Sequence, residues 1–241
     1  QALNDLQQTI KEHYNNTCEF KFNSIVNDII HSNGEVKGLN VLNNNGEIET
    51  IHTPIIVNSS GPWCNEIINK LGGLDIKLTL KPVRIQVIYK DTPELYTPEF
   101  LKDKEYGVPI PVISDERGGV YMRPQVKSKQ ILVSTAKEEE ERDYLDDFTL
   151  PSGADPEFRN KYLNSLYHRL EPCLEPKSSK VQSLNGIYTV CEDDVHYLIG
   201  ESKLKGFYLC NGFSGHGFKC GPSVGSILAQ DITKLTLDDD T

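Results

Sequence analysis

The stretch FYLCNGFSGHGFKCGPSVG, residues 207–225, changes its character twice. Phe207 to Cys210 are aromatic and apolar and predict a buried strand, which stops at Asn211-Gly212. Four glycines follow within ten residues, and Pro222 comes directly after them. Apolar side chains then recur at helical spacing: Val224, Ile227, Leu228, Ile232 and Leu235. The pattern predicts a strand, a glycine-rich loop and a helix.

Glycine at this density predicts positive φ angles or a backbone that lies very close to a flat or charged group. The helix that follows would offer unpaired N–H groups and the positive end of its dipole, so an anion is the expected guest. The alternative is a tight turn that only packs the helix against a sheet, because an isolated glycine pattern is weak evidence for a ligand.

Three other stretches accompany GFSGHGFKCGPSVG: IIVNSSGPWCNEI (55–67), GGVYMRPQ…ILVSTAKEE (118–139) and GIYTVCEDDVHYLIG (186–200). In order and spacing they resemble the FAD-dependent amine and amino-acid oxidoreductases, the family of D-amino-acid oxidase, glycine oxidase, sarcosine oxidase and the sarcosine and dimethylglycine dehydrogenases. The resemblance covers most of the chain from Phe20 onward. It implies FAD as cofactor and a small amine or amino acid as substrate, oxidised by hydride transfer to the flavin.

The predicted fold class is α+β, with a mixed, mainly antiparallel sheet in a substrate domain and the C-terminal remnant of a Rossmann-like FAD-binding domain. The expected domains are 1–76 (partial FAD-binding domain with a β-meander), 77–185 (substrate-binding domain) and 186–241 (return to the FAD domain). The fingerprint G-x-G-x-x-G occurs at no strand-to-helix turn of the sequence. We therefore expect a C-terminal fragment, or a subunit whose ADP-binding half is supplied elsewhere. Alone, such a chain is expected to bind FAD weakly or not at all and to be inactive.

In the first third of the chain, apolar spacing predicts a helix up to Tyr14. Asn33-Gly34 and Asn45-Gly46 are hairpin signals and predict an antiparallel meander, with residues 54–58 as its buried last strand. Gly61-Pro62-Trp63 then opens a short helix that is expected to reach Leu71.

Further along, alternation predicts a long strand at 78–90, with Arg84 and Gln86 on one face and Val83, Ile85 and Val87 on the other. The remaining expected elements are an antiparallel pair at 118–124 and 130–136, an acidic solvated loop at 143–155, a helix at 156–170 with Asp155 as its N-cap, and strands near 180–190 and 195–199.

The resemblance implies cofactor contacts at two glycine-containing junctions: Gly61, Pro62 and Trp63, and Gly212, Phe213, Ser214, Gly215, Gly217 and Phe218. Backbone N–H groups from Ser214 to Phe218 would stabilise the negative charge that reduction places on the flavin. The first junction is equally readable as an ordinary helix start with an early proline.

Lys219 matches the basic residue that holds the substrate carboxylate in sarcosine-oxidase-like relatives, and we assign it a catalytic and substrate-binding role. His216, between two glycines, is a second catalytic candidate, since its ring could face the flavin. Tyr121 and Arg123 share one face of a strand and are candidate substrate-binding residues, because arginine suits a planar carboxylate. Each of these side chains could instead be an ordinary surface residue.

Two departures from the family favour a dehydrogenase over an oxidase. The cysteine that binds flavin covalently in monomeric sarcosine oxidases falls at Gly186, so that linkage is not expected. Their oxygen-activating lysine falls near Leu132. The competing hypothesis from another class is a flavin-free interaction module, or a subunit beside a separate FAD-binding chain.

The composition limits the classes of binding partner and the cellular compartment that we expect. A formal charge of −10 argues against nucleic acid and anionic membranes as partners. No apolar run reaches the roughly 18 residues that a membrane span needs. The six cysteines are scattered, without a C-x-x-C pair or metal-ligand spacing, so we expect no metal site and a reducing cytoplasm.

Overall fold

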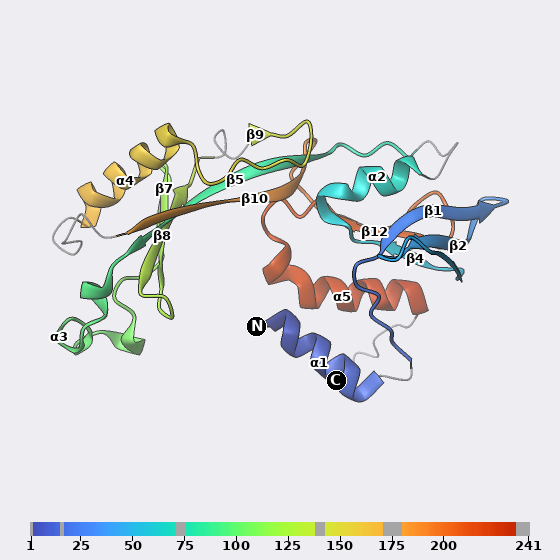
Figure 1. The fold of residues 1–241 in the computed structure, drawn as a ribbon, viewed down its shortest axis with the longest axis horizontal. Coiled ribbons are helices and arrows are strands. Elements are labelled where there is room, and N and C mark those ends of the chain that lie inside the picture. Colours follow the sequence, from blue (N-terminus) through green and yellow to red (C-terminus); the bar gives the residue numbers. More distant parts are fainter. Residues whose placement is uncertain (1, 15–16, 71–75, 138–142, 171–179, 235–241) are drawn as a thin grey trace. The chain divides into compact units, whose positions relative to one another are not determined.

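The computed structural model describes residues 2–14, 17–70, 76–137, 143–170 and 180–234, and the chain divides into two compact units (Figure 1). Unit 1 comprises residues 1–77 and 199–210, and unit 2 comprises residues 78–198 and 211–241. Helices and mainly antiparallel sheets build both units, which confirms the predicted α+β class.

Unit 1 begins with α1 (Ala2–Tyr14), as predicted, followed by an antiparallel sheet of β1 (Ile25–Ser32), β2 (Glu35–Leu42) and β3 (Ile48–His52). Asn33 and Gly34 join the first two strands with φ angles of 52° and 76°. Asparagine and glycine adopt this left-handed conformation most readily, which is why the hairpin could be predicted from two letters.

The prediction for residues 54–58 was wrong in the pairing of the strand and in its burial. The strand there, β4 (Ile56–Asn58), leaves the meander and pairs in parallel with β12 (Phe207–Asn211), in a second sheet of order β11-β12-β4 that includes β11 (Leu198–Glu201). It is also only partly buried, since Val57 is 38% exposed. Its partner lies far along the chain, so no local pattern could indicate the pairing.

After β4 the chain forms the 3-10 turn η1 (Gly61–Trp63) and the helix α2 (Cys64–Asn69). The predicted end of this helix at Leu71 lies outside the described residues. Burial raises the pKa of the Cys64 thiol to about 12, so this cysteine serves as a small apolar side chain.

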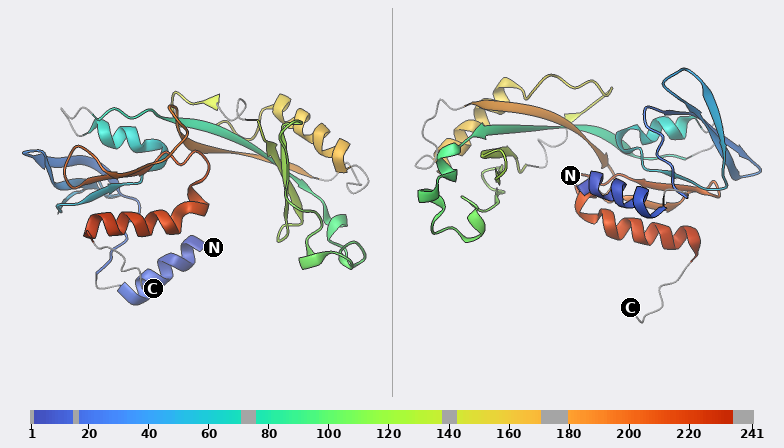
Figure 2. Two further views of the ribbon diagram at one scale, coloured as in Figure 1. Left: turned by 180° about the vertical axis from the view of Figure 1, so that it is seen from behind. Right: turned by 60° about the horizontal axis from the view of Figure 1, so that its bottom comes forward.

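Unit 2 contains an antiparallel sheet of order β10-β5-β8-β7-β6, with β9 paired to β5. The strands are β5 (Leu80–Asp91), β6 (Ile113–Asp115), β7 (Val120–Gln125), β8 (Gln130–Thr135), β9 (Asp143–Tyr144) and β10 (Val181–Cys191). Figure 2 shows β5 and β10 as long curved strands side by side. The predicted long strand and the predicted pair of strands near 120 and 130 are confirmed. Short turns η2 (Pro93–Tyr96), α3 (Pro98–Leu101) and η3 (Glu105–Gly107) follow β5.

The helix α4 (Pro156–Leu170) covers one face of this sheet (Figure 1). Its Tyr162 and Leu166 are fully buried against a cluster of strand residues: Ile88, Val120, Met122, Ile131 and Val133. Burying each such side chain stabilises the fold by about 1.5–3 kcal/mol. Because successive strand residues point to opposite faces, their immediate neighbours face away from α4.

The acidic segment 143–155 is not simply a solvated loop. Asp143 lies in β9, and both Asp143 and Asp155 bind the guanidinium of Arg84. Asp155 therefore does not cap α4 with its side chain: its backbone carbonyl accepts from the amide of Arg159, while its carboxylate binds Arg84 and Gln86. The guanidinium offers a charged partner, which is stronger than a neutral helix amide.

The last helix, α5 (Gly217–Thr233), follows β12 and the glycine-containing loop in the predicted order. Pro222 lies within the second turn, where it removes one backbone donor without ending the helix. Val224 and Leu228 are buried as the spacing predicted, but Ile227 is 58% exposed. The expected contribution of Leu235 lies outside the described residues.

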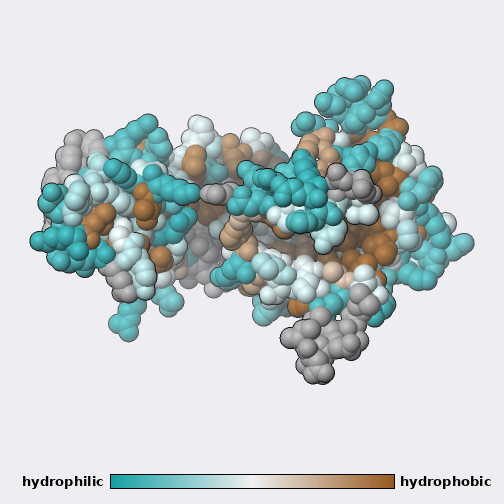
Figure 3. Space-filling model, turned by 90° about the horizontal axis from the view of Figure 1, so that it is seen from below, coloured by the Kyte–Doolittle hydropathy of each residue, from teal (hydrophilic) through white to brown (hydrophobic). Residues whose placement is uncertain are grey.

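Hydrophilic residues occupy much of the surface that Figure 3 presents, with hydrophobic residues between them. None of the helices within the described ranges has the length and apolar character needed to cross a bilayer.

Candidate functional site

The face of the unit 2 sheet that points away from α4 lines an open cavity of about 590 Å³. The sheet contributes Ile85 and Val87 from β5, Tyr121 and Arg123 from β7, Leu132 and Ser134 from β8, and Tyr188 from β10. The loop before α5 and the first turn of this helix contribute Ser214, Gly215, His216 and Lys219. A cavity of this size suits a small ligand.

Strand alternation explains why these side chains reach the cavity. Val120 and Met122 are fully buried on the α4 side, so Tyr121 and Arg123 point the other way. In the same manner Ile88 faces α4, whereas Val87 faces the cavity. One face of the sheet therefore packs a hydrophobic core against α4, and the other face lines a partly charged cavity.

The glycine loop reaches the cavity through left-handed backbone conformations. Gly212, Ser214 and Gly215 have φ angles of 74°, 47° and 83°. A Cβ atom at Gly215 would lie 2.9 Å from the ring of Tyr188, and one at Gly212 would lie 2.7 Å from Leu80. Both glycines are favoured by backbone conformation, and a larger residue at either position would also have to displace the neighbouring side chain.

Two of the amides that we expected to face a flavin are used within the protein. The amide of Ser214 donates to the carbonyl of Thr189 at 2.9 Å, and the amide of His216 donates to the carbonyl of Phe213 at 2.8 Å. The Ser214 hydroxyl donates to the carbonyl of Gly212 and accepts from the amide of Cys191. Gly215, Gly217 and Phe218 are left as the candidate amide donors of this segment.

The N-terminus of α5 fits an anionic guest. His216 is the N-cap residue, and its side chain makes no capping hydrogen bond. The first-turn amides are therefore not satisfied by a side-chain cap, and Lys219 adds a positive charge in the same turn. The residues present thus fit the electron-rich edge of a reduced flavin ring, which needs hydrogen-bond donors and a close approach of the backbone.

The charged side chains of the cavity make few hydrogen bonds or ion pairs with the described residues. Among the residues that the structure describes, Arg123 makes a single hydrogen bond, from Nη1 to Oε1 of Gln125 at 3.3 Å. Within the same part of the chain, the side chains of Tyr121, His216 and Lys219 have no hydrogen-bond or ion-pair partner. Their donors are therefore available to a ligand, and a carboxylate is the natural partner of an arginine and a lysine.

The structure brings together six of the residues that the sequence singled out: Tyr121, Arg123, Ser214, Gly215, His216 and Lys219. Gly212 is buried below the loop, and Phe213 stacks on Tyr197 with ring centroids 5.3 Å apart. Gly217 and Phe218 open α5 without lining the cavity, and Phe218 is 81% exposed. The catalytic, cofactor and substrate roles of all these residues stay predictions.

Gly61, Pro62 and Trp63 belong to unit 1 and form η1. Asn58 shapes this junction: its Oδ1 accepts from the amide and the hydroxyl of Ser60, and its Nδ2 donates to the carbonyl of Cys64. Gly61 has a φ angle of 58°, so glycine is favoured there on conformational grounds alone. Their predicted cofactor role stays a prediction.

Sequence reasoning missed five polar members of the cavity: Ser114, Glu116, Ser134, Thr135 and Tyr188. Ser114 pairs with Tyr121 in the β6–β7 register, so the two share a face. The signal was present in principle, because Glu116 follows Ser114 by two residues. It could not be read without knowing that residues 113–115 form a strand, which is too short for a local pattern.

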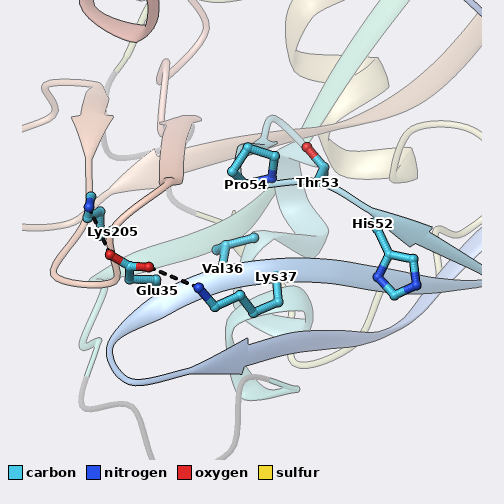
Figure 4. Close-up of a pocket in the computed structure, with 7 residues that line it drawn as sticks. All are labelled: Glu35, Val36, Lys37, His52, Thr53, Pro54 and Lys205. Carbon is cyan, nitrogen blue, oxygen red and sulfur yellow. Dashed lines mark hydrogen bonds and ion pairs between the residues drawn. The ribbon is translucent and has the colours of Figure 1, made fainter.

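A second cavity, of about 360 Å³, lies in unit 1 between the β2 strand, residues 52–54 and Lys205 (Figure 4). Glu35 binds Lys205 at 2.8 Å and Lys37 at 2.9 Å, and these two ammonium groups lower its pKa to about 2. The charged side chains of this cavity therefore largely neutralise one another, which makes the cavity a weaker candidate for a ligand site than the unit 2 cavity.

No cluster of three or more metal-ligating side chains occurs among the described residues.

Comparison with known proteins gives a consistent result. Residues 6–231 match the family model described as FAD dependent oxidoreductase. The chain is 29% identical to human peroxisomal sarcosine oxidase over 193 residues, which is 75% of this chain and 44% of that protein. It is 25% identical over 205 residues to the Xenopus laevis FAD-dependent oxidoreductase domain-containing protein 1, covering 78% of this chain and 36% of that protein.

Solved structures show the same fold at low identity. L-proline dehydrogenase from P. horikoshii has a TM-score of 0.65 at 23% identity, over 88% of this chain and 50% of that one. Glycine oxidase from Geobacillus kaustophilus has a TM-score of 0.60 at 18% identity, over 90% and 50% of the two chains. The chain thus spans about half the length or less of the relatives that it matches.

Proposed function

The chain belongs to the FAD dependent oxidoreductase family, and from this premise we propose that it supplies the substrate cavity and a flavin-contacting loop for the oxidation of an amine or amino acid. The proposed substrates are small compounds of the sarcosine, glycine or dimethylglycine type. The observation that carries the proposal is the cavity in which Tyr121 and Arg123 share one space with His216 and Lys219. The activity is proposed for the FAD-loaded protein that contains this chain.

The bound FAD would accept a hydride from the carbon next to the substrate nitrogen. Arg123 and Lys219 would hold the substrate carboxylate, and Tyr121 would add a neutral donor beside them. The first-turn amides at Gly217 and Phe218 would hold the flavin edge that gains negative charge. Ile85, Val87 and Leu132 give the cavity an apolar wall, which excludes water from the reacting atoms. His216, which is the N-cap residue and lines the cavity, would accept or release a proton at its edge.

We infer that the enzyme is a dehydrogenase rather than an oxidase. By the resemblance, the oxygen-activating lysine of the oxidases would fall near Leu132, and this leucine is only 6% exposed in the cavity wall. An apolar side chain there offers no positive charge to a reduced oxygen species. The flavin is also proposed to be non-covalent, because Gly186 stands where monomeric sarcosine oxidases carry their linking cysteine.

The test is anaerobic reduction of the FAD-loaded protein by sarcosine, glycine, dimethylglycine and proline, followed by absorbance of the oxidised flavin. Bleaching by at least one of these supports the proposed oxidation. The reduced protein is then mixed with oxygen or with an artificial electron acceptor. Faster reoxidation by oxygen than by the acceptor would contradict the dehydrogenase assignment, and no bleaching by any amine would contradict the function itself.

The second candidate is a flavin-free interaction module or a subunit beside a separate FAD-binding chain. It rests on the sequence itself, in which the fingerprint G-x-G-x-x-G occurs at no strand-to-helix turn. A purified protein that binds no FAD, and that copurifies with a second flavoprotein, would support this alternative. For either function we propose a cytoplasmic location, because every cysteine within the described residues is a free thiol.

A further inference from the structure

We propose that Glu116 recognises a cationic group of the substrate, at several bonds from the carboxylate that Arg123 would hold. This inference rests on the proposed oxidation of an amine or amino acid. Within that class it favours substrates with a second, positively charged centre over the small compounds of the sarcosine, glycine or dimethylglycine type. Glu116 is the acidic residue among the side chains that line the unit 2 cavity. No hydrogen bond or ion pair engages its carboxylate in the described part of the chain.

In the β6–β7 pair, Ser114 lies opposite Tyr121, and both line the cavity. The last pair before the turn is Asp115 with Val120, and Glu116 follows Asp115 into that turn. Arg123 lies three residues beyond Val120 in the other direction, which is about 10 Å along β7 at about 3.3 Å per residue. Glu116 and Arg123 therefore line the cavity from opposite ends of this hairpin. A zwitterion can therefore contact both residues only if several bonds lie between its charges.

The hairpin turn that carries Glu116 is held in place from the opposite face of the sheet. The neighbouring Asp115 accepts hydrogen bonds from Nε and Nη2 of Arg169 in α4. Its second oxygen accepts from the amide of Gly118 at 2.8 Å, which closes the turn. Asp115 is thereby fixed on the α4 side, strand alternation directs Ser114 towards the cavity, and Glu116 lines the cavity from the turn. A free surface loop would give no such orientation.

Glu116 does not form an ion pair with the positively charged side chains of the cavity that the structure describes. Arg123 and Lys219 lie in the same cavity, yet neither forms an ion pair with it in the described structure. The site therefore presents an acidic end and a basic end that stay separate. Such a site favours a ligand with both charges and disfavours a dicarboxylate, which would place a negative charge against Glu116.

The experiment compares redox-inert ligands that differ only in charge. The long pair is 4-(trimethylammonio)butanoate and its neutral-headed isostere 5,5-dimethylhexanoate, and the short pair is trimethylglycine and 3,3-dimethylbutanoate. Binding to the FAD-loaded protein is measured by calorimetry, so turnover is not required. For an ion pair at a solvent-accessible site, we expect the long zwitterion to bind roughly three- to tenfold more tightly than its isostere.

Glu116→Gln should remove this preference and leave the affinity for 5,5-dimethylhexanoate unchanged. Glu157→Gln is the matched control, because Glu157 is an exposed glutamate of α4 that does not line the cavity, and it should keep the preference. An unchanged preference in Glu116→Gln would overturn the inference, and so would a preference confined to the short pair. Carboxylate binding without any preference overturns this inference alone, whereas no carboxylate binding at all also overturns the proposed substrate site.

Discussion

Arg84 and Asp155 form a two-point ion pair, with Nη1 3.1 Å from Oδ1 and Nη2 2.6 Å from Oδ2. The same guanidinium donates through Nε to Asp143 in β9. One arginine side chain, which is only 12% exposed, thereby ties β5 to β9 and to the start of α4. The opposite face of β5 carries Ile85 and Val87 into the cavity, so this ion pair supports the strand that forms the apolar wall.

Arg84→Met should destabilise the protein by about 1–3 kcal/mol, because two carboxylates lose charged hydrogen bonds that the methionine cannot replace. The free energy of unfolding in urea is the measurement. Lys81→Met is the control, since Lys81 pairs with Glu192 at an exposed position and its loss should cost at most about 1 kcal/mol. Equal losses of unfolding free energy in the two variants would show that the Arg84 ion pairs stabilise the protein no more than an exposed ion pair does.

The stability should decrease at acidic pH because of Asp155. Arg84 lowers the pKa of Asp155 below its ordinary value of 3.8. A carboxyl with a lowered folded-state pKa stabilises the protein above its unfolded pKa, and this contribution is lost as the pH falls through the folded value. Unfolding free energies of wild type and Asp155→Asn, measured between about pH 5 and pH 2, should converge as the pH falls. A constant difference between them would contradict the prediction.

Gly215→Ala should reduce the stability by about 1–2 kcal/mol, because alanine is strained at a φ of 83° and its Cβ would approach the Tyr188 ring. Gly225→Ala is the matched control: this glycine lies inside α5, and a Cβ atom added there would meet nothing within 4 Å. There the same substitution should stabilise by about 0.5–1 kcal/mol. Thermal unfolding of both variants should therefore give shifts of opposite sign.

Lys219→Met should lower kcat/KM for a carboxylated amine about ten- to a hundredfold, because the carboxylate would lose a charged hydrogen bond worth about 1.5–3 kcal/mol. The decarboxylated analogue should be affected much less, and the flavin content should stay unchanged. Steady-state kinetics on both substrates is the measurement, with the exposed Lys203→Met as control. Equal losses on both substrates, or loss of flavin, would indicate that Lys219 supports the loop rather than the carboxylate.

Local patterns predicted α1, the Asn33-Gly34 hairpin, the long strand β5 and α4 because each is specified by neighbours in sequence. The residues that share each face of β5 could be predicted for the same reason. The sequence by itself also determined the family, since four separated stretches matched it in order, and the match to residues 6–231 confirms this.

Only the tertiary structure decided which distant segments meet. It pairs β4 with β12, engages Asp155 with Arg84 instead of the α4 amides, and uses the amides of Ser214 and His216 within the protein. It also brings Glu116 into the cavity of Arg123 and Lys219. These outcomes depend on partners that are far apart in sequence and compete for the same donors and acceptors, and that competition is resolved only when the chain is folded.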